Sequence, residues 1–494
     1  GQNAHIAWGF TNTNPDVQYL YLERIKPDDG KEYQTADGWA VFDSHEETIK
    51  VKGAADEKIT VRSTRHGPVI SDAGKFDGLL GSPDKQSYVL AMRWTALDAD
   101  NNSVQAGLNM DRADSVQAFI EGARTWVAPM QSMVVADRAG RIAWVAPGRV
   151  PIRAINNDLQ GQAPSPGWLP QYDWTGWVPF EQLPQQINPA LGMIATANQR
   201  VVPADFPHYL TNEWAMPFRF NRIDALLQAK PKHSLQSLAE IQADVRSEPV
   251  LSMLPWLGKS RSNHPLAKAA LGTLAGFDGQ MSVDSAVPLI YFAWQRELNQ
   301  AVFADELGQA TFKRLNRVNR DALQGVLARN DAWWCDDKNT AAAQETCGHQ
   351  MDTALTHALD ALQARFGKDV SRWRWGDAHF AVSEHRPFSN VPLLAKWFGL
   401  RTPVSGDGNT VNVASVDIGP MFGAEAAFAG THGPSLRALY DVGEPRHSRV
   451  MTSTGQSGLP FSTHYDDFVQ TWAQVRYVPL WSDAPPAHEL TLLP

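Results

Sequence analysis

The chain has 494 residues, with 44 basic and 53 acidic side chains, a formal net charge of −9 and a pI near 5.9. Its composition, 43% hydrophobic and 20% charged, can supply a sizeable core, which excludes an intrinsically disordered chain. The net acidity and the lack of a Lys- or Arg-rich run argue against nucleic acid as the main partner. No apolar run is long enough for a transmembrane helix, so no membrane association is predicted.

The first 150 residues show the alternation and turn pairs that are typical of short strands. Apolar or alternating runs at residues 6–11, 19–22 and 59–63 predict strands, because Asp-Gly, Asn-Pro and His-Gly pairs separate such runs. Residues 133–137 and 140–145 predict a β-hairpin that turns at Arg138, Ala139 and Gly140. This part of the chain is therefore expected to form sheets.

Residues 155–190 are rich in Pro, Gly and Trp without periodicity, which predicts a long ordered loop. From about residue 220 the pattern becomes helical. Ser234 is a candidate N-cap for a helix, and Leu355, Leu359, Leu362 and Phe366 form a stripe at helical spacing. Both helices are expected to contribute to the core.

Beyond residue 400, Gly, Ser and Val return, and residues 411–414 predict a strand. The order of strands, helices and strands indicates a mixed α+β enzyme. We assign residues 1–220 and 400–494 as mainly sheet-forming and residues 221–400 as a mainly helical insertion of the same domain.

The chain has two cysteines, Cys335 and Cys347, separated by a short polar segment. This arrangement favours a local disulfide and therefore an oxidising compartment, periplasmic or extracellular. A zinc site is the weaker interpretation, because His349 alone does not complete a tetrahedral set of ligands. The 18 tryptophans mostly predict core packing, although a Trp-rich carbohydrate-binding surface is an alternative.

Standard short motifs do not define the chemistry. The sequence has no Gly-x-Ser-x-Gly elbow, His-Glu-x-x-His pair, Walker loop or dinucleotide fingerprint. Residues 405–410 resemble a phosphate loop only in their glycines and predict a turn that connects strands. Composition and short motifs alone indicate a secreted globular hydrolase or binding protein.

Longer blocks carry more information, and four of them occur in the same order as in one enzyme family. The blocks are GQNAHIAWGFTNT at 1–13, YDWTGWVPF at 172–180, IATANQR at 194–200 with PFRFNRI at 217–223, and GQSG at 455–458 with STHY at 462–465. Together they resemble the penicillin acylase family of N-terminal-nucleophile amidohydrolases, which includes the acyl-homoserine lactone acylases.

The resemblance implies a four-layer αββα sandwich built from an α chain and a larger β chain cut from one precursor. It also implies a Ser nucleophile at the N-terminus of the β chain, whose own α-amine accepts the proton, with no cofactor for catalysis. That Ser precedes the block that begins at Gly1, and Gly1 has no hydroxyl. We therefore expect a processed or truncated β chain whose partners are the α chain and the segment that carries the nucleophile.

Three residues match positions of the family's catalytic site. Asn12 falls where the family uses a main-chain N–H, and Asn198 falls where it uses a side-chain amide as the second donor. Arg219 matches an Arg that orients the site. Without the resemblance, the two asparagines read as turn or capping residues and Arg219 reads as a surface ion pair, with Arg222 as a competing candidate.

The resemblance also implies a structural calcium and an acyl pocket. Asp16 and Asp205 fall where relatives place calcium ligands, although Gln18 replaces an acidic position. Solvated turn carboxylates are the alternative. Met133 matches an aromatic residue of the acyl pocket, where a flexible thioether suits a linear acyl chain, and Phe10 is a second candidate wall. Both are also compatible with ordinary core positions.

Together these observations predict an amidohydrolase that removes an acyl group from a small amide through an acyl-enzyme. Long-chain N-acyl-homoserine lactones are slightly favoured as substrates over the amides of penicillins or cephalosporins. A non-catalytic small-molecule-binding relative on the same scaffold is the alternative from a different class.

Overall fold

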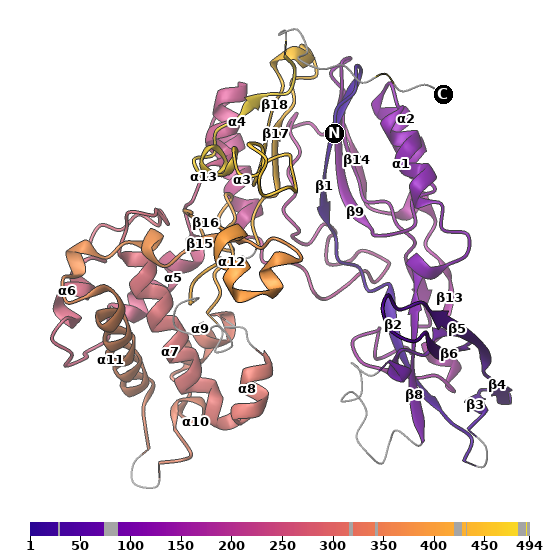
Figure 1. Ribbon diagram of the computed structural model, residues 1–494, viewed down its shortest axis with the longest axis horizontal. Helices are drawn as coiled ribbons and strands as arrows, with labels where there is room; N and C mark the ends of the chain where they lie inside the picture. The colour runs from indigo at the N-terminus through magenta and orange to yellow at the C-terminus, as the bar shows by residue number, and fades with distance from the viewer. Residues whose placement is uncertain are drawn as a thin grey trace. The chain divides into compact units, whose positions relative to one another are not determined.

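The computed structural model describes residues 1–27, 30–73, 87–315, 320–340, 344–418, 427–430, 432–482 and 491. The chain divides into two compact units, Gly1–Phe220 and Asn221–Pro494, here called the N-terminal and C-terminal units. Both helices and strands are present (Figure 1). Among the residues described, no helix combines the length and apolar character needed to cross a membrane.

In the residues that the structure describes, the N-terminal unit is mainly β-structure, with the α-helices α1 and α2 beside its sheets. Its strands are β1 Ile6–Asn12, β2 Gln18–Arg24, β3 Glu32–Thr35, β4 Gly38–Val41, β5 Asp43–Ile49, β6 Glu57–Thr64, β7 Gly67–Pro68, β8 Tyr88–Trp94, β9 Gln131–Asp137, β10 Ile142–Val145, β11 Pro151–Arg153, β12 Ser165–Pro166, β13 Trp174–Trp177 and β14 Gln185–Ile187. Its helices are α1 Ser103–Asp111 and α2 Val116–Ala123.

The sheet that matters most for the site has the strand order β1-β9-β10-β14, with antiparallel pairs throughout. The predicted hairpin is confirmed as β9 and β10. Helix α2 covers one face of this sheet, and Phe119 of α2 packs with Ile6, Met133 and Val135 in a shared apolar cluster (Figure 1). The alternation of apolar residues along β1 and β9 places this cluster on a single face.

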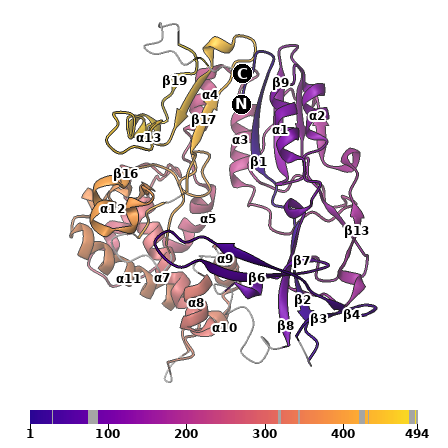
Figure 2. The same cartoon turned by 45° about the vertical axis from the view of Figure 1, so that its right-hand side comes forward.

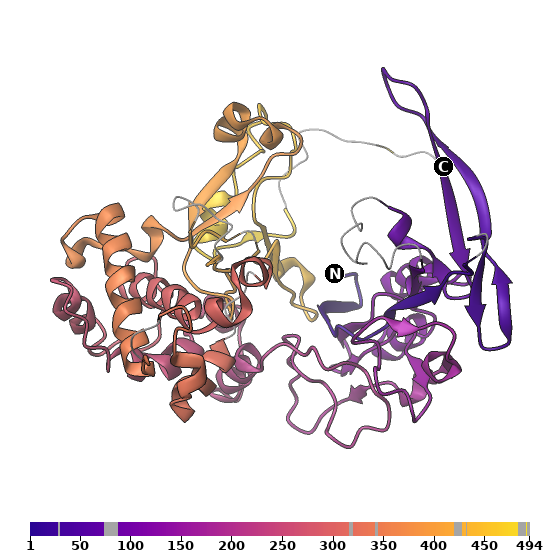
Figure 3. The same ribbon diagram turned by 90° about the horizontal axis from the view of Figure 1, so that it is seen from below.

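The other sheets of the N-terminal unit are small. They have the orders β12-β2-β8, β11-β13, β3-β4 and β5-β6-β7. The β5–β6 pair forms a long ribbon that extends from the rest of this unit (Figures 2 and 3). Residues 155–190, expected to be a loop, contain the three short strands β12, β13 and β14, because their pairing depends on partners elsewhere in the chain.

The C-terminal unit is mainly helical. Its helices are α3 Phe218–Gln228, which begins in the N-terminal unit, α4 Leu235–Gln242, α5 Glu248–Leu257, α6 Ala267–Gly272, α7 Val287–Leu307, α8 Gln309–Leu315, α9 Arg320–Arg329, α10 Ala332–Cys335, α11 Cys347–Phe366, α12 Pro392–Phe398 and α13 Val469–Ala473. Its strands are β15 Phe380–Ser383, β16 Leu400–Pro403, β17 Leu436–Leu439, β18 Arg449–Thr452 and β19 Val478–Pro479, in the sheets β15-β16 and β17-β18-β19.

Helices α7 and α11 lie side by side and form the centre of the C-terminal core (Figure 1). Leu355, Leu359 and Leu362 of α11 are buried, as their spacing predicts. Ser234 caps α4 by accepting a hydrogen bond from the main-chain N–H of Ser237, as expected. Cys335 and Cys347 form a disulfide between α10 and α11.

The prediction of a strand at residues 411–414 is wrong. The segment is a compact loop, in which Val413 N–H donates to the Val411 carbonyl and Ala414 N–H donates to that of Asp407. The buried carboxylate of Asp407 accepts hydrogen bonds from Ser247 and from the N–H of Asn409. These contacts satisfy the polar groups of the loop without a strand partner.

Candidate active site

Strand β1 lies at the edge of its sheet, and its hydrogen-bonding pattern decides where its main-chain groups point. Trp8 N–H donates to Gly1 O and Ile6 O accepts from Asn3 N–H, so the polar groups of Ile6 and Trp8 turn away from β9. Main-chain direction repeats every second residue in an antiparallel pair. The N–H and C=O of Asn12 therefore point to the same outer edge of β1.

Asn198 reaches this edge from a distant loop. Its side-chain Nδ2 donates to Asn12 O at 2.8 Å, and Gln131 Nε2 of β9 holds the Asn12 side chain at 2.9 Å. Nearby, the hydroxyls of Thr11 and Thr196 are 2.8 Å apart. The backbone of Asn198 adopts φ +68°, which Asn tolerates better than most residues. The two sequence-predicted asparagines are thus in direct contact.

Arg219 completes the cluster from the first turn of α3. Its Nη2 donates to Asn198 Oδ1 at 3.0 Å, and burial lowers the pKa of the guanidinium. No carboxylate pairs with Arg219 among the residues that the structure describes. Arg222, the competing candidate, instead makes two hydrogen bonds with the Asp244 carboxylate, at 2.6 and 3.1 Å.

The charge of Arg219 makes the Asn198 amide a stronger hydrogen-bond donor. A positive charge donating to Oδ1 polarises the Asn198 amide and strengthens its N–H groups as donors. The Asn198 Nδ2 group carries two hydrogen atoms. One of them is donated to Asn12 O, which leaves the other for a second acceptor. A side-chain amide, an outward main-chain N–H and a half-buried cation within one cluster can stabilise negative charge on an oxygen.

The two predicted acyl-pocket residues face each other across the β1–β9 pair. Phe10 and Met133 are directly opposite in the register, so their side chains share one face of the sheet. Phe10 is 43% exposed and meets Trp126 edge-on, with ring centroids 6.5 Å apart. Met133 is fully buried in the cluster under α2. Contact between either residue and an acyl chain stays a prediction.

The two predicted calcium ligands have different surroundings in the described structure. Asp16 accepts hydrogen bonds from the hydroxyls of Tyr209 at 2.6 Å and Thr211 at 3.3 Å, and burial raises the pKa of its carboxyl. Asp205 is exposed. Within the described ranges, no group of three or more His, Cys, Asp or Glu side chains is placed to hold a metal ion.

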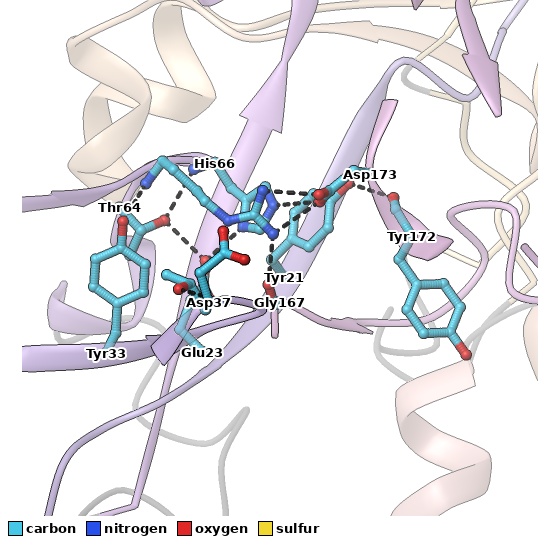
Figure 4. A network of polar contacts seen from close by, with 11 residues as sticks. Tyr21, Glu23, Tyr33, Asp37, Thr64, His66, Gly167, Tyr172 and Asp173 are labelled. Carbon is cyan, nitrogen blue, oxygen red and sulfur yellow. Dashed lines mark hydrogen bonds and ion pairs between the residues drawn. The ribbon is translucent and has the colours of Figure 1, made fainter. Parts of the chain in front are cut away.

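A second polar network fixes the YDWTGWVPF block to β2 and to the turn after β6 (Figure 4). The His66 ring lies between two carboxylates, with Glu23 Oε1 2.7 Å from Nδ1 and Asp173 Oδ1 2.9 Å from Nε2. Arg65 makes two hydrogen bonds with Asp173, at 2.8 and 3.0 Å, and Tyr21 stacks on the His66 ring. Hydrogen bonds hold the members of this largely buried network to one another, so we assign it to structural support.

Comparison with known proteins places these observations in a family. The model of the penicillin amidase family matches residues 1–488. The chain belongs to the penicillin amidase family. The fold is similar to that of a solved structure, a thermostable penicillin G acylase from Alcaligenes faecalis. That structure aligns with a TM-score of 0.72 and 20% identity over 100% of this chain and 89% of the other. The four-layer arrangement itself stays a prediction.

Two relatives illustrate the range of names within the family. An acyl-homoserine lactone acylase QuiP of Pseudomonas syringae pv. tomato is 29% identical over 508 residues, covering 97% of this chain and 58% of the relative. A penicillin acylase 2 proenzyme of Pseudomonas sp. strain SE83 is 32% identical, covering 97% of this chain and 59% of the relative. The chain therefore spans less than two thirds of the length of these relatives.

Sequence reasoning missed the residues that support the cluster. Gln131 and Thr196 carry no local signal, because each becomes significant only through a partner more than a hundred residues away. Gln131 could have been found once the hairpin was paired with β1, since the register sets it opposite Asn12. Arg153, which contacts Asp16, has no comparable signal in the sequence.

Proposed function

We propose that this chain forms the larger part of an acylase that hydrolyses the amide bond of a small N-acyl compound. The observation that carries the proposal is the contact of Asn198 with both Asn12 and Arg219, which has the composition of an oxyanion hole. Membership of the penicillin amidase family supports the same chemistry. No metal or organic cofactor enters the proposed reaction.

The nucleophile in this proposal is a Ser at the N-terminus of a separate segment of the same precursor. Its hydroxyl oxygen bonds to the amide carbonyl carbon while its α-amine accepts the hydroxyl proton. The carbonyl oxygen becomes an oxyanion that accepts hydrogen bonds from Asn12 N–H and Asn198 Nδ2. Collapse breaks the C–N bond, and the α-amine returns the proton to the leaving amine. Water then hydrolyses the ester and releases the acid.

We favour N-acyl-homoserine lactones as the substrate class. Phe10 and Met133 present an aromatic ring and a thioether on one sheet face, which suits a linear acyl chain, and several relatives are named acyl-homoserine lactone acylases. The amides of β-lactams are the second candidate, because another relative is named a penicillin acylase.

The test begins with intact-mass measurement of the purified protein, together with every polypeptide that accompanies it, before and after a serine-reactive probe. The proposal expects one N-terminal Ser to gain the mass of the probe. Release of homoserine lactone from acyl chains of graded length is then compared with hydrolysis of penicillin G. Absence of both labelling and turnover, with retained binding of N-acyl compounds, would instead identify a non-catalytic binding relative.

A further inference from the structure

Arg153, at the end of β11, gathers oxygen atoms from several segments of the N-terminal unit. Its guanidinium donates to the main-chain oxygens of Pro151 at 3.0 Å and Tyr209 at 3.1 Å, and also to that of Asp16. Its Nε donates to the Tyr19 hydroxyl. Three carbonyl oxygens and one hydroxyl thus converge on one cation.

The rest of the surroundings also suits a guanidinium. The rings of Tyr19 and Tyr209 lie against it, with centroids 5.4 and 4.9 Å from its central carbon. Arginine combines hydrogen bonding at its edge with stacking on its faces, which a metal ion does not do. The Asp16 carboxylate is close enough to interact electrostatically with Arg153 and is itself held by the hydroxyls of Tyr209 and Thr211.

A calcium ion would need a different set of groups at this place. Calcium takes about six to eight oxygen ligands, with carboxylates supplying much of the negative charge. Here the convergent carbonyl oxygens already accept N–H groups, and the Asp16 oxygens accept hydroxyl protons. The residues present therefore do not fit the calcium that the sequence resemblance implies.

We propose that Arg153 is the resident cation of this site and replaces a structural calcium. Through its hydrogen bonds, the guanidinium links the loop after β1, strand β2 and the segment around Tyr209. That segment lies between Asn198 and Arg219 in the chain, and Asp16 follows Asn12 closely. Arg153 thereby secures both segments that contribute to the Asn12–Asn198 contact.

The test measures calcium content and thermal unfolding of the purified protein, which need no substrate and are independent of the proposed acylase activity. Wild type is expected to contain substoichiometric calcium and to keep its Tm in EDTA and in added calcium. Arg153→Ala is expected to lower the Tm by roughly 5–10 °C. The control Arg62→Ala, which removes the ion pair with Asp72 and the guanidinium contact with the Phe42 ring, is expected to change the Tm much less.

Two further measurements keep the proposal testable if Arg153→Ala folds poorly. Arg153→Lys keeps the charge but loses the planar fork, so its Tm is expected to lie between those of wild type and Arg153→Ala. Millimolar methylguanidinium is expected to raise the Tm of Arg153→Ala but not of Arg62→Ala. Two outcomes would overturn the proposal. One is stoichiometric calcium whose removal lowers the Tm of wild type but not of Asp16→Asn; the other is an Arg153→Ala variant as stable as the control.

Discussion

The side-chain amide of Asn198 donates to the main-chain oxygen of Asn12 across 2.8 Å, joining a strand edge to a loop 186 residues further along the chain. Arg219 holds the other end of the same amide. This geometry fixes which side of Asn198 faces the strand edge. It also means that the amide can be removed without disturbing a packed core, which makes its role measurable.

Removing the Asn198 amide is expected to impair catalysis with little effect on folding. Asn198→Gly preserves the left-handed backbone but deletes the donor, so kcat should fall by about 10²–10³-fold while the Tm stays close to that of wild type. Asn188→Gly is the matched control, because Asn188 also has a positive φ. Equal losses of kcat in the two variants would argue against an oxyanion role.

Arg219 is expected to act as a positioning residue for Asn198. Arg219→Lys should lower kcat by about tenfold or more, since a Lys ammonium lacks the planar fork that reaches Oδ1. KM should change less than kcat if the amide acts mainly in the transition state. Arg222→Lys, which weakens the ion pair with Asp244, serves as the comparison and should affect stability more than kcat.

Two substitutions of Met133 test its role in core packing and its role in substrate selection separately. Because its side chain is fully buried, Met133→Ala should lower the free energy of unfolding in urea by about 2–5 kcal/mol. Met133→Leu should cost less than about 1.5 kcal/mol and, if the residue borders the acyl pocket, shift the preferred acyl-chain length. Met130→Leu provides a buried control in a different cluster. Identical chain-length profiles for both Leu variants would mean that Met133 only packs the core.

Gly167 is expected to be intolerant of a side chain. A Cβ atom there would lie 2.0 Å from Oε2 of the buried Glu23, within the network around His66. Gly167→Ala should therefore destabilise the fold by about 1–3 kcal/mol. At Gly176 the nearest atom to a new Cβ is 3.8 Å away, so Gly176→Ala should be close to neutral in the same thermal unfolding assay.

His379 predicts a pH dependence of stability. Burial lowers its pKa to about 4 in the fold, while the unfolded chain has the ordinary value of 6.5. The unfolded state therefore binds more protons between these values, and stability should fall as the pH drops from about 6.5 to about 4. His379→Asn can still donate to Phe428 O but does not titrate in this range. A wild-type and variant pair with parallel stability curves over this range would contradict the prediction.

Much of the local structure follows directly from the sequence. The alternation in β1 and β9, the Ser234 cap of α4 and the leucine stripe of α11 are short-range patterns, and each is present as predicted. Patterns of this kind depend on a few neighbouring residues and on the period of the element they form. The Cys335–Cys347 pair was equally local.

The functional arrangement needed the tertiary structure. The resemblance predicted Asn12, Asn198 and Arg219 as site residues. The structure decided between Arg219 and Arg222 as the arginine of the site, because Arg222 forms an ion pair with Asp244. Arg153 had no signal at all, because its partner Asp16 lies 137 residues away. Convergence of this kind is set by strand register and loop packing across the whole unit. A short window of sequence encodes a helix or a strand. It does not encode the long-range contacts that bring these elements together.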